Sequence, residues 1–340
     1  MRSVVVRKAN FGPLKTATVF LRWFEDPISG RKTYKYDGGM GQGAARTIKR
    51  NSILISKPNV VKDMAESAIT LRALTIAGYD PSSGAGITAD LQVFAAHSVA
   101  GVSAVTALTV QSRKGVRRVE PVGAALLQET LDLLAKDGPI DGVKVGMLGR
   151  CELVEVVTKF LESVRIARER VVLDPVIRSS SGAELLDAEG VSALRERLLP
   201  LAGWITPNVE EAAALLGVGV PGREGVPGLA GRLGELGRTT PPWPRQNQAR
   251  PEWGTREYGS GLNVVVTGGD LEPPDDFLRS DSGEEVWFPG SRVEARGVHG
   301  THGTGCVFSS ALLCRLMLGD SKVEAVRGAK AWVVGRLEGP

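Results

Sequence analysis

From residue 73 onward, short runs of consecutive apolar residues alternate with segments in which apolar residues recur every three or four positions. The first pattern is typical of strands buried on both faces, and the second is typical of helices with one buried face. The predicted strands are 73–77, 102–110, 142–146, 171–173, 204–206 and 263–267. The predicted helices are 87–97, 124–135, 152–164, 188–199, 209–216, 229–236 and 307–318. This alternation predicts an α/β fold, with a doubly wound, mostly parallel sheet and helices on both of its faces.

Three segments fall outside the alternation. Residues 1–70 show no sustained period, so we expect a basic, poorly ordered extension ahead of one domain at 71–340, with a transit peptide as an alternative interpretation. Residues 237–262 are rich in Pro, Arg and Gly and predict a surface insertion. Residues 273–283 predict an acidic turn, followed at 284–288 by one arm of an edge hairpin.

The charge of the chain is unevenly distributed. Its net charge is +4, yet residues 1–62 carry 13 Lys and Arg against 3 acidic residues, a balance of +10 that leaves 4 − 10 = −6 for the remainder. No basic amphipathic helix accompanies this segment, so we expect no nucleic-acid partner. Three cysteines without metal-ligand spacing, and no apolar run near the ~18 residues of a spanning helix, favour a cytoplasmic protein without a membrane partner.

Polar residues and glycines follow the predicted strands. In doubly wound sheets, ligands bind beyond the carboxyl ends of the strands, so these residues are expected to share one edge. They are Gly78, Asp80, Gln111, Met147, Asp174, Asn208 with Glu211, Gly268, Gly269, and the turn Gly303 to Cys306.

The turn Gly303-Thr304-Gly305-Cys306 precedes the last predicted helix. A glycine turn that leads into a helix directs unpaired backbone N–H groups and the positive end of the helix dipole at one spot, which predicts an anion site. A thiol at a helix N-terminus has a pKa below its usual ~8.5, so Cys306 is expected to act as a base. The lone histidines His97, His299 and His302 are expected to be structural.

An anion site faced by carboxylates suits phosphoryl transfer, in which Mg²⁺ bridges the donor phosphates. Asp174 and Glu211 are the candidate metal carboxylates, because Mg²⁺ keeps several waters and needs few protein oxygens. Simpler interpretations stay open: Asp174 as a turn residue, Glu211 as a solvated helix residue, Asn208 as a helix N-cap and Gln111 as a partner of loop backbone. No Walker A motif occurs, and Gly84-Ala85-Gly86 is only a weak dinucleotide fingerprint.

Several of these strings, in this order, resemble the hydroxymethylpyrimidine/phosphomethylpyrimidine kinases of thiamine biosynthesis, which belong to the ribokinase-like superfamily. The strings are 73–78 with Asp80 and Pro81, 84–87 with 89–91, 106–111, 144–148, 172–176, Ser181-Gly182, 205–208 with Glu211, and 302–306. The Gly-Thr-Gly-Cys form is similar to the pyrimidine kinases and some pyridoxal kinases, since most sugar kinases of the superfamily carry Asp at the position of Cys306.

The resemblance implies a ribokinase-like fold and an ATP- and Mg²⁺-dependent kinase. Its substrates are 4-amino-5-hydroxymethyl-2-methylpyrimidine and the monophosphate of that alcohol. Cys306 is implied as the base, and the N–H groups of Gly303, Thr304 and Gly305 as the oxyanion site. The implied substrate-binding residues are Gln111, Gly78, Asp90, Met147 and Val176. The implied nucleotide-binding residues are Asn208, Glu211, Thr267 and Gly269.

The chain departs from the family pattern in three places. Thr267 stands where the family often has Lys, Asp270 stands where it often has His, and family members usually continue past the last helix, so we expect a shortened C-terminus. The alternatives are a pyridoxal kinase on the same fold, a catalytically weak pyrimidine-binding relative and, more distantly, a dehydrogenase. The oligomeric state stays open, with a homodimer as one option.

Overall fold

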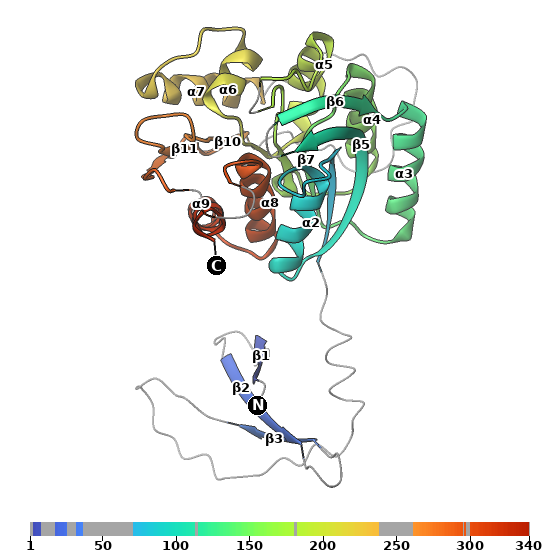
Figure 1. The fold of residues 1–340 in the computed structure, drawn as a ribbon, viewed down its shortest axis with the longest axis vertical. Helices are drawn as coiled ribbons and strands as arrows, with labels where there is room; N and C mark the ends of the chain where they lie inside the picture. The colour runs from blue at the N-terminus through green and yellow to red at the C-terminus, as the bar shows by residue number, and fades with distance from the viewer. Residues whose placement is uncertain are drawn as a thin grey trace. The chain divides into compact units, whose positions relative to one another are not determined.

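The computed structural model describes residues 3–7, 18–25, 32–36, 71–112, 115–179, 182–237, 261–294, 296 and 300–339. The chain divides into two units, Met1–Ser67 and Ala68–Pro340. Figure 1 shows both units.

The first unit contains a three-stranded antiparallel sheet in the order β1-β2-β3. Its strands are β1 (Ser3–Arg7), β2 (Thr18–Glu25) and β3 (Lys32–Tyr36). No helix or strand was predicted from the sequence in this unit. The strands are short and rich in β-branched and aromatic residues, so composition favours them where a search for a sustained period does not. The poor order expected of 1–70 stays a prediction, since most of these residues lie outside the described ranges.

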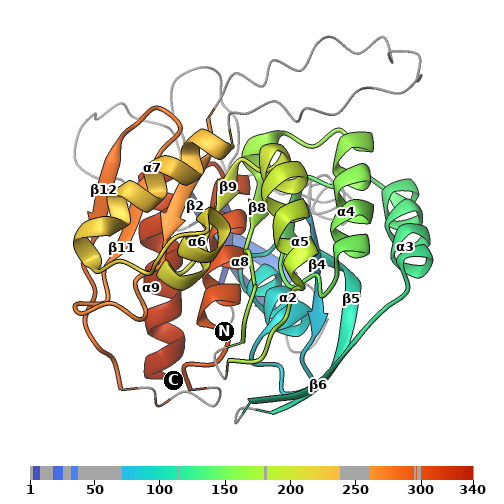
Figure 2. The ribbon, with the colours of Figure 1, turned by 90° about the horizontal axis from the view of Figure 1, so that it is seen from above.

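The second unit is built on a nine-stranded sheet in the order β12-β11-β10-β9-β8-β7-β4-β5-β6, which can be followed across Figure 2. The six central strands, β10-β9-β8-β7-β4-β5, are parallel. At the edges, β6 pairs antiparallel with β5, β11 with β10, and β12 with β11. The bounds are β4 (Arg72–Tyr79), β5 (Ala100–Ser112), β6 (Gly115–Pro121), β7 (Gly142–Val145), β8 (Val171–Leu173), β9 (Trp204–Ile205), β10 (Asn263–Val266), β11 (Asp276–Arg279) and β12 (Glu285–Phe288).

Helices cover both faces of this sheet (Figure 1). One face carries α3 (Ala124–Asp137), α4 (Cys151–Ser163), α5 (Ala188–Ala193), α6 (Val209–Leu216) and α7 (Val226–Leu236). The other carries α2 (Gly86–Ala96), α8 (Thr304–Met317) and α9 (Lys322–Glu338). The predicted α/β, doubly wound fold is therefore confirmed.

The two apolar cores follow from the alternation of side chains along the strands. In β4, Leu74 packs into the core under α3 to α7, whereas its neighbour Ala73 packs into the core under α2, α8 and α9. In β8, Leu173 and Val172 divide between the cores in the same way. Successive strand residues point to opposite faces, so a strand buried on both faces has to be apolar throughout. This requirement explains the uninterrupted apolar runs of the sequence.

Several elements differ from the prediction. β6 was not predicted, and β11 lies inside the segment expected to be an acidic turn. There Phe277 and Leu278 are both buried, so they form the second arm of the edge hairpin. The single helix predicted at 188–199 is α5 followed by a π-turn and a 3-10 turn that contains Pro200. The insertion predicted at 237–262 falls almost entirely outside the described residues. Within the described ranges, every helix is too short or too polar to cross a lipid bilayer.

Candidate functional site

Two glycine turns meet at the carboxyl ends of the central strands. One links β4 to α2, and the other leads into α8. Gly303 has a φ of +75°, and a Cβ atom there would lie 2.0 Å from the carbonyl oxygen of Gly84. Gly86 has a φ of +60°, and its Cβ atom would lie 2.2 Å from the carbonyl oxygen of Gly78. Glycine is therefore required at both positions, since only a missing side chain allows the backbones to approach so closely.

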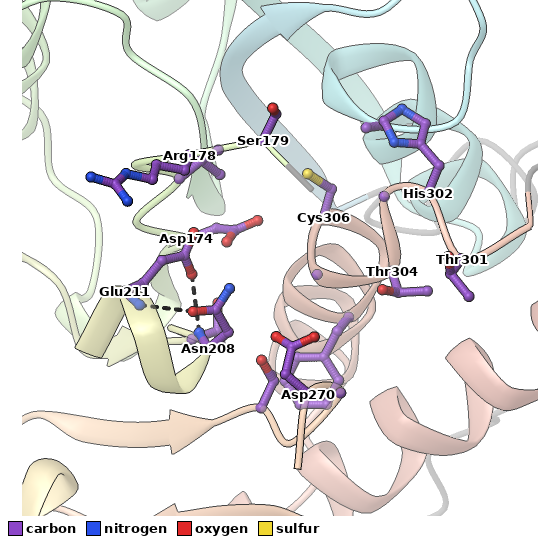
Figure 3. Close-up of a pocket in the computed structure, with 18 of the residues that line it drawn as sticks. Asp174, Arg178, Ser179, Asn208, Glu211, Asp270, Thr301, His302, Thr304 and Cys306 are labelled. Atoms are coloured by element: carbon purple, nitrogen blue, oxygen red, sulfur yellow. Dashed lines mark hydrogen bonds between the residues drawn. The ribbon is translucent and has the colours of Figure 1, made fainter. Parts of the chain in front are cut away.

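A cavity of about 1030 Å³ opens over these turns. All but one of the functional residues predicted from the sequence line it, and Figure 3 shows part of the set. They are Gly78, Gln111, Met147, Asp174, Val176, Asn208, Glu211, Thr267, Gly269, Gly303, Thr304, Gly305 and Cys306. The expectation that strand-end residues share one edge is met by this arrangement.

Asp90 is the exception: the structure places it in the core and not, as predicted, in the pyrimidine pocket. It is fully buried on α2 and does not line the cavity. It accepts hydrogen bonds from Thr75 Oγ1 at 2.6 Å and Ser310 Oγ at 2.7 Å, and it pairs with Lys144. A buried carboxylate needs such partners, and here they lie between the sheet and the helices.

The first turn of α8 presents the backbone groups on which the predicted anion site depends. Gly303 is its N-cap, so the N–H groups of Thr304, Gly305 and Cys306 begin the helix without carbonyl partners in the helix itself. A Cβ atom on Gly305 would meet nothing within 4 Å, so the space above this turn belongs to the cavity. Three N–H groups and the helix dipole therefore face an open space large enough for a phosphate.

The thiol of Cys306 differs from the prediction. Burial raises its pKa to about 12, and Asp174 and Asp90 add to the rise, while Lys144 and the backbone N–H of Gly86 oppose it. The side chain keeps some exposure through the cavity but is crowded by protein on its other sides. The helix dipole alone would favour the thiolate. Burial beside two carboxylates outweighs it, so Cys306 is a neutral thiol in the free protein.

Asn208 and Glu211 form a capping box at the start of α6. The Asn208 side chain accepts from Glu211 N at 2.8 Å, and Asn208 N donates to Glu211 Oε2 at 3.0 Å (Figure 3). Both side chains still line the cavity. Burial raises the pKa of Glu211 to about 8, and the negative charges of Asp174 and Asp270 add to the rise.

These carboxylates fit a divalent cation in one respect: their surroundings compensate the ionised form poorly, as the raised pKa of Glu211 indicates. Burial also raises the pKa of Asp174, although Lys144 opposes the rise. The described residues contain no cluster of three or more His, Cys, Asp or Glu that could hold a metal ion alone. Mg²⁺ needs only one or two carboxylates when water and phosphate complete its shell.

Gln111 contacts a histidine across the cavity. Its Nε2 atom lies 2.9 Å from His302 Nε2, and the same ring nitrogen lies 2.9 Å from Asp80 Oδ2. Burial alone would raise the pKa of Asp80, but hydrogen bonds from His302, Ser82 and Ala85 hold it below its usual value. Asp80 is thus a carboxylate, and His302 Nε2 must carry the proton of the hydrogen bond between them. With that proton on Nε2, the Gln111 amide nitrogen at 2.9 Å would meet a second donor. The hydrogen bond therefore requires the amide to be turned over, so that its oxygen accepts from His302 and its NH₂ group faces the cavity.

Three cations at the cavity were not singled out from the sequence. Lys330 binds Asp276 and the carbonyl of Pro274, and Arg292 binds the carbonyls of Gly269 and Leu271. The guanidinium of Arg178 is exposed and has no hydrogen bond or ion pair among the described residues. In Figure 3 it is turned away from Cys306. Single cations at separate points of a chain form no motif, so no signal in the sequence marked them.

Comparisons with known proteins agree with this geometry. A family model described as phosphomethylpyrimidine kinase matches residues 80–240 and 256–339. A hydroxymethylpyrimidine/phosphomethylpyrimidine kinase from Rhizobium meliloti (strain 1021) is 37% identical over 268 residues, which cover 78% of this chain and 90% of the relative.

Two solved structures are also similar. Phosphomethylpyrimidine kinase from Clostridium difficile 630 has a TM-score of 0.61 and 30% identity, covering 77% of this chain and 97% of that one. Pyridoxal kinase from Staphylococcus aureus in complex with AMP-PCP and pyridoxal has a TM-score of 0.63 and 27% identity, covering 79% and 88%.

Proposed function

The chain belongs to the phosphomethylpyrimidine kinase family and is a kinase. From this premise we propose that it transfers the γ-phosphoryl group of ATP to the hydroxymethyl oxygen of 4-amino-5-hydroxymethyl-2-methylpyrimidine, and then phosphorylates the monophosphate. Both steps belong to thiamine biosynthesis.

One observation carries the proposal: the open N-terminus of α8 and the amide of Gln111 face the same cavity. The helix start offers N–H groups to a phosphoryl group in transfer. The Gln111 amide, turned so that its oxygen accepts from His302, would offer its NH₂ group to a ring nitrogen of the pyrimidine. Met147 and Val176 line the same cavity with apolar side chains, which suit a flat ring. Donor and acceptor sites are thus adjacent.

ATP fits the remaining part of the cavity, whose volume exceeds that of a pyrimidine alcohol. We propose that its phosphates run from Gly269 to the first turn of α8, both of which are open to the cavity. Other apolar residues of the cavity lining are suited to an adenine ring; they are Val218, Val220, Val333, Val334 and Leu337. Asp174 and Glu211 would hold Mg²⁺, which supplies charge neutralisation at the donor phosphates when bound.

The protein's own groups then position the reactants. Cys306 lies in the first turn of α8 beside Asp174, where the acceptor hydroxyl would sit (Figure 3). Because its thiol is neutral in the free protein, Cys306 can accept the hydroxyl proton only as the thiolate, after its own proton has been lost to solvent. Transfer through a loose transition state depends mainly on positioning and charge. Removal of the hydroxyl proton is therefore not required until late in the transfer.

The test is a kinase assay with purified protein, ATP, Mg²⁺ and the pyrimidine alcohol, with the products identified by mass spectrometry. Monophosphate and then diphosphate should accumulate. Cys306→Ala is the matched control, and it should retain ADP binding in calorimetry while it loses turnover. Absence of phosphorylated product from protein that binds ADP and unfolds cooperatively would overturn the proposal.

A pyridoxal kinase activity is the second candidate, because the similarity to the Staphylococcus aureus pyridoxal kinase extends over 79% of this chain. The two alcohols differ in the ring that Gln111 meets. Competition between them at equal concentration decides the case: a higher kcat/KM for pyridoxal would favour this second candidate. The homodimer considered above is checked by light scattering of the same sample.

A further inference from the structure

A lysine lies beneath the floor of the cavity, where none of the proposed roles uses it. Lys144 is on β7, its side chain is 0% exposed, and it does not line the cavity. A Cβ atom at Gly146 would lie 2.9 Å from its Nζ atom, so the ammonium is enclosed by backbone as well. Burying a charge is costly unless it is paired and hydrogen-bonded. The pairing of Lys144 therefore indicates what it does.

Asp90 is the first partner of Lys144. The Nζ atom lies 3.1 Å from Oδ1 and 3.0 Å from Oδ2 of Asp90. Thr75 and Ser310 donate to the same carboxylate, so Asp90 is held by three side chains from β4, β7 and α8. Burial alone would lower the pKa of Lys144, but Asp90 and Asp174 raise it above its usual value. The ammonium is therefore charged and fixed in place.

Asp174 is the second partner, and it reaches into the cavity. Its Oδ2 atom lies 3.7 Å from Lys144 Nζ and accepts a hydrogen bond of 3.1 Å from Ser309 Oγ. Both contacts are to one oxygen, so they fix the orientation of the carboxylate and leave Oδ1 outside this anchor. Adjacent hydroxyls of α8, on Ser309 and Ser310, thus hold the two carboxylates on either side of a single ammonium.

We propose that Lys144 is a positioning residue for phosphoryl transfer: anchored by Asp90, its ammonium fixes the Asp174 carboxylate at the reaction centre beside Cys306. The three charges are one cation and two anions, so Lys144 balances only one carboxylate. Asp174 keeps negative charge directed at the cavity, where the phosphate-bearing reactants are proposed to bind. This inference rests on the proposed kinase function.

The competing explanation is that Lys144 only neutralises Asp90 and stabilises the fold. Removing Lys144 alone would leave Asp90 buried and unpaired, which destabilises the protein whatever the role of the lysine. The informative comparison is therefore between D90N and D90N/K144M, which differ only at residue 144. The amide introduced by D90N keeps an oxygen for Thr75 and Ser310, and the methionine introduced by K144M fills the volume of the lysine stem.

We expect kcat of D90N/K144M to be about 10- to 100-fold below that of D90N, with KM for the alcohol and for ATP within about threefold, since a displaced catalytic group affects turnover more than binding. Ser309→Ala should lower kcat in the same direction. The free energy of unfolding measured with urea should be no lower for D90N/K144M than for D90N. Equal kcat values in D90N and D90N/K144M would overturn the proposal.

A second measurement separates this inference from the kinase proposal. Calorimetry of ADP binding, with and without Mg²⁺, reports on Asp174 without any turnover. The Mg²⁺-dependent gain in ADP affinity should be smaller in D90N/K144M than in D90N, and an equal gain would contradict the positioning role. Wild-type protein without kinase activity would refute the proposed function, while this binding comparison would still decide the role of Lys144.

Discussion

Gln111 and His302 are 191 residues apart in the sequence, yet the Nε2 atom of the amide lies 2.9 Å from the Nε2 atom of the ring. His302 also binds Asp80, so strand β5, the turn after β4 and the turn before α8 are joined through one imidazole. The histidine expected to be structural is thus the group that orients the amide expected to bind the substrate.

This contact predicts that Gln111 and His302 act as a unit. Gln111→Ala and His302→Ala should each weaken binding of the pyrimidine alcohol by about tenfold, because each removes the oriented NH₂ donor. The double variant should be little weaker than either single variant, with a coupling energy on the order of 1 kcal/mol. Calorimetry on the four proteins measures this cycle. Additive losses would show that His302 does not orient the amide.

The two glycines of the α8 turn offer a matched pair of substitutions. Gly303→Ala should lower the free energy of unfolding by more than about 2 kcal/mol, since it combines a left-handed φ with a collision against the Gly84 carbonyl. Gly305→Ala meets no atom within 4 Å, so it should leave stability equal or slightly higher.

Gly305→Ala, the variant that should keep its stability, is the one expected to lose function. The methyl group of Gly305→Ala enters the space over the helix N-terminus, so we expect ADP affinity and kcat to fall at least tenfold in a fully folded protein. Urea unfolding and ADP calorimetry check the two halves. Normal ADP affinity in Gly305→Ala would place the phosphates elsewhere in the cavity.

A common cavity for these residues could be predicted from the sequence because topology alone brings them together. A parallel sheet sends every strand end to one edge, so Gln111, Asp174 and Glu211 could be assigned to a common cavity from apolar runs and chain order. Side-chain orientation carries no such signal. Nothing in the sequence distinguishes Asp90 and Lys144 from residues that face a ligand, and only packing decides that they face the interior.

Electrostatic environment was the least predictable property. The helix N-terminus at Cys306 was visible in the sequence, and the structure begins α8 at this turn. The carboxylates beside the thiol come from α2 and from the end of β8, so their effect on its pKa depended on the fold. The prediction of edge strands failed for a related reason. Strand β11 is four residues long and begins with the acidic residue Asp276, whose partner Lys330 lies far away in the sequence on α9.

The raised pKa of Cys306 predicts a slow thiol. With a pKa of about 12, the thiolate makes up roughly one part in ten thousand at pH 8, against about a quarter for an ordinary thiol. Alkylation of Cys306 by iodoacetamide should therefore be slow and should rise about tenfold per pH unit from 8 to 10. Peptide mass spectrometry resolves Cys306 from Cys151 and Cys314, and Cys306→Ser identifies its peptide. A rate that levels off near pH 8 would restore the low pKa first expected.

Glu211 predicts a dependence of stability on pH. Its pKa is about 8 in the folded protein, against 4.5 without burial, so the folded state binds more protons than the unfolded state between these values. Stability should therefore fall as pH rises from about 5 to 8.5. Glu211→Gln removes the titration and keeps an oxygen for the Asn208 N–H group, so it should be more stable than wild type at pH 8.5, and the difference should shrink toward pH 5.

The size of this difference is on the order of 1 to 3 kcal/mol, because the side chain is partly open to the cavity and solvent screens its charge. Urea unfolding at pH 5, 7 and 8.5 measures it. Glu211→Asp is the control, since it keeps the charge and should keep the decline with pH. Glu211→Gln should also lose the stabilisation that Mg²⁺ gives wild type at pH 8.5, because the carboxylate proposed to hold the ion is gone. Parallel pH profiles for wild type and Glu211→Gln would contradict the prediction, because they would show that the pKa of Glu211 is not raised in the folded protein. A poorly compensated carboxylate would then not be the feature that suits the site to a cation.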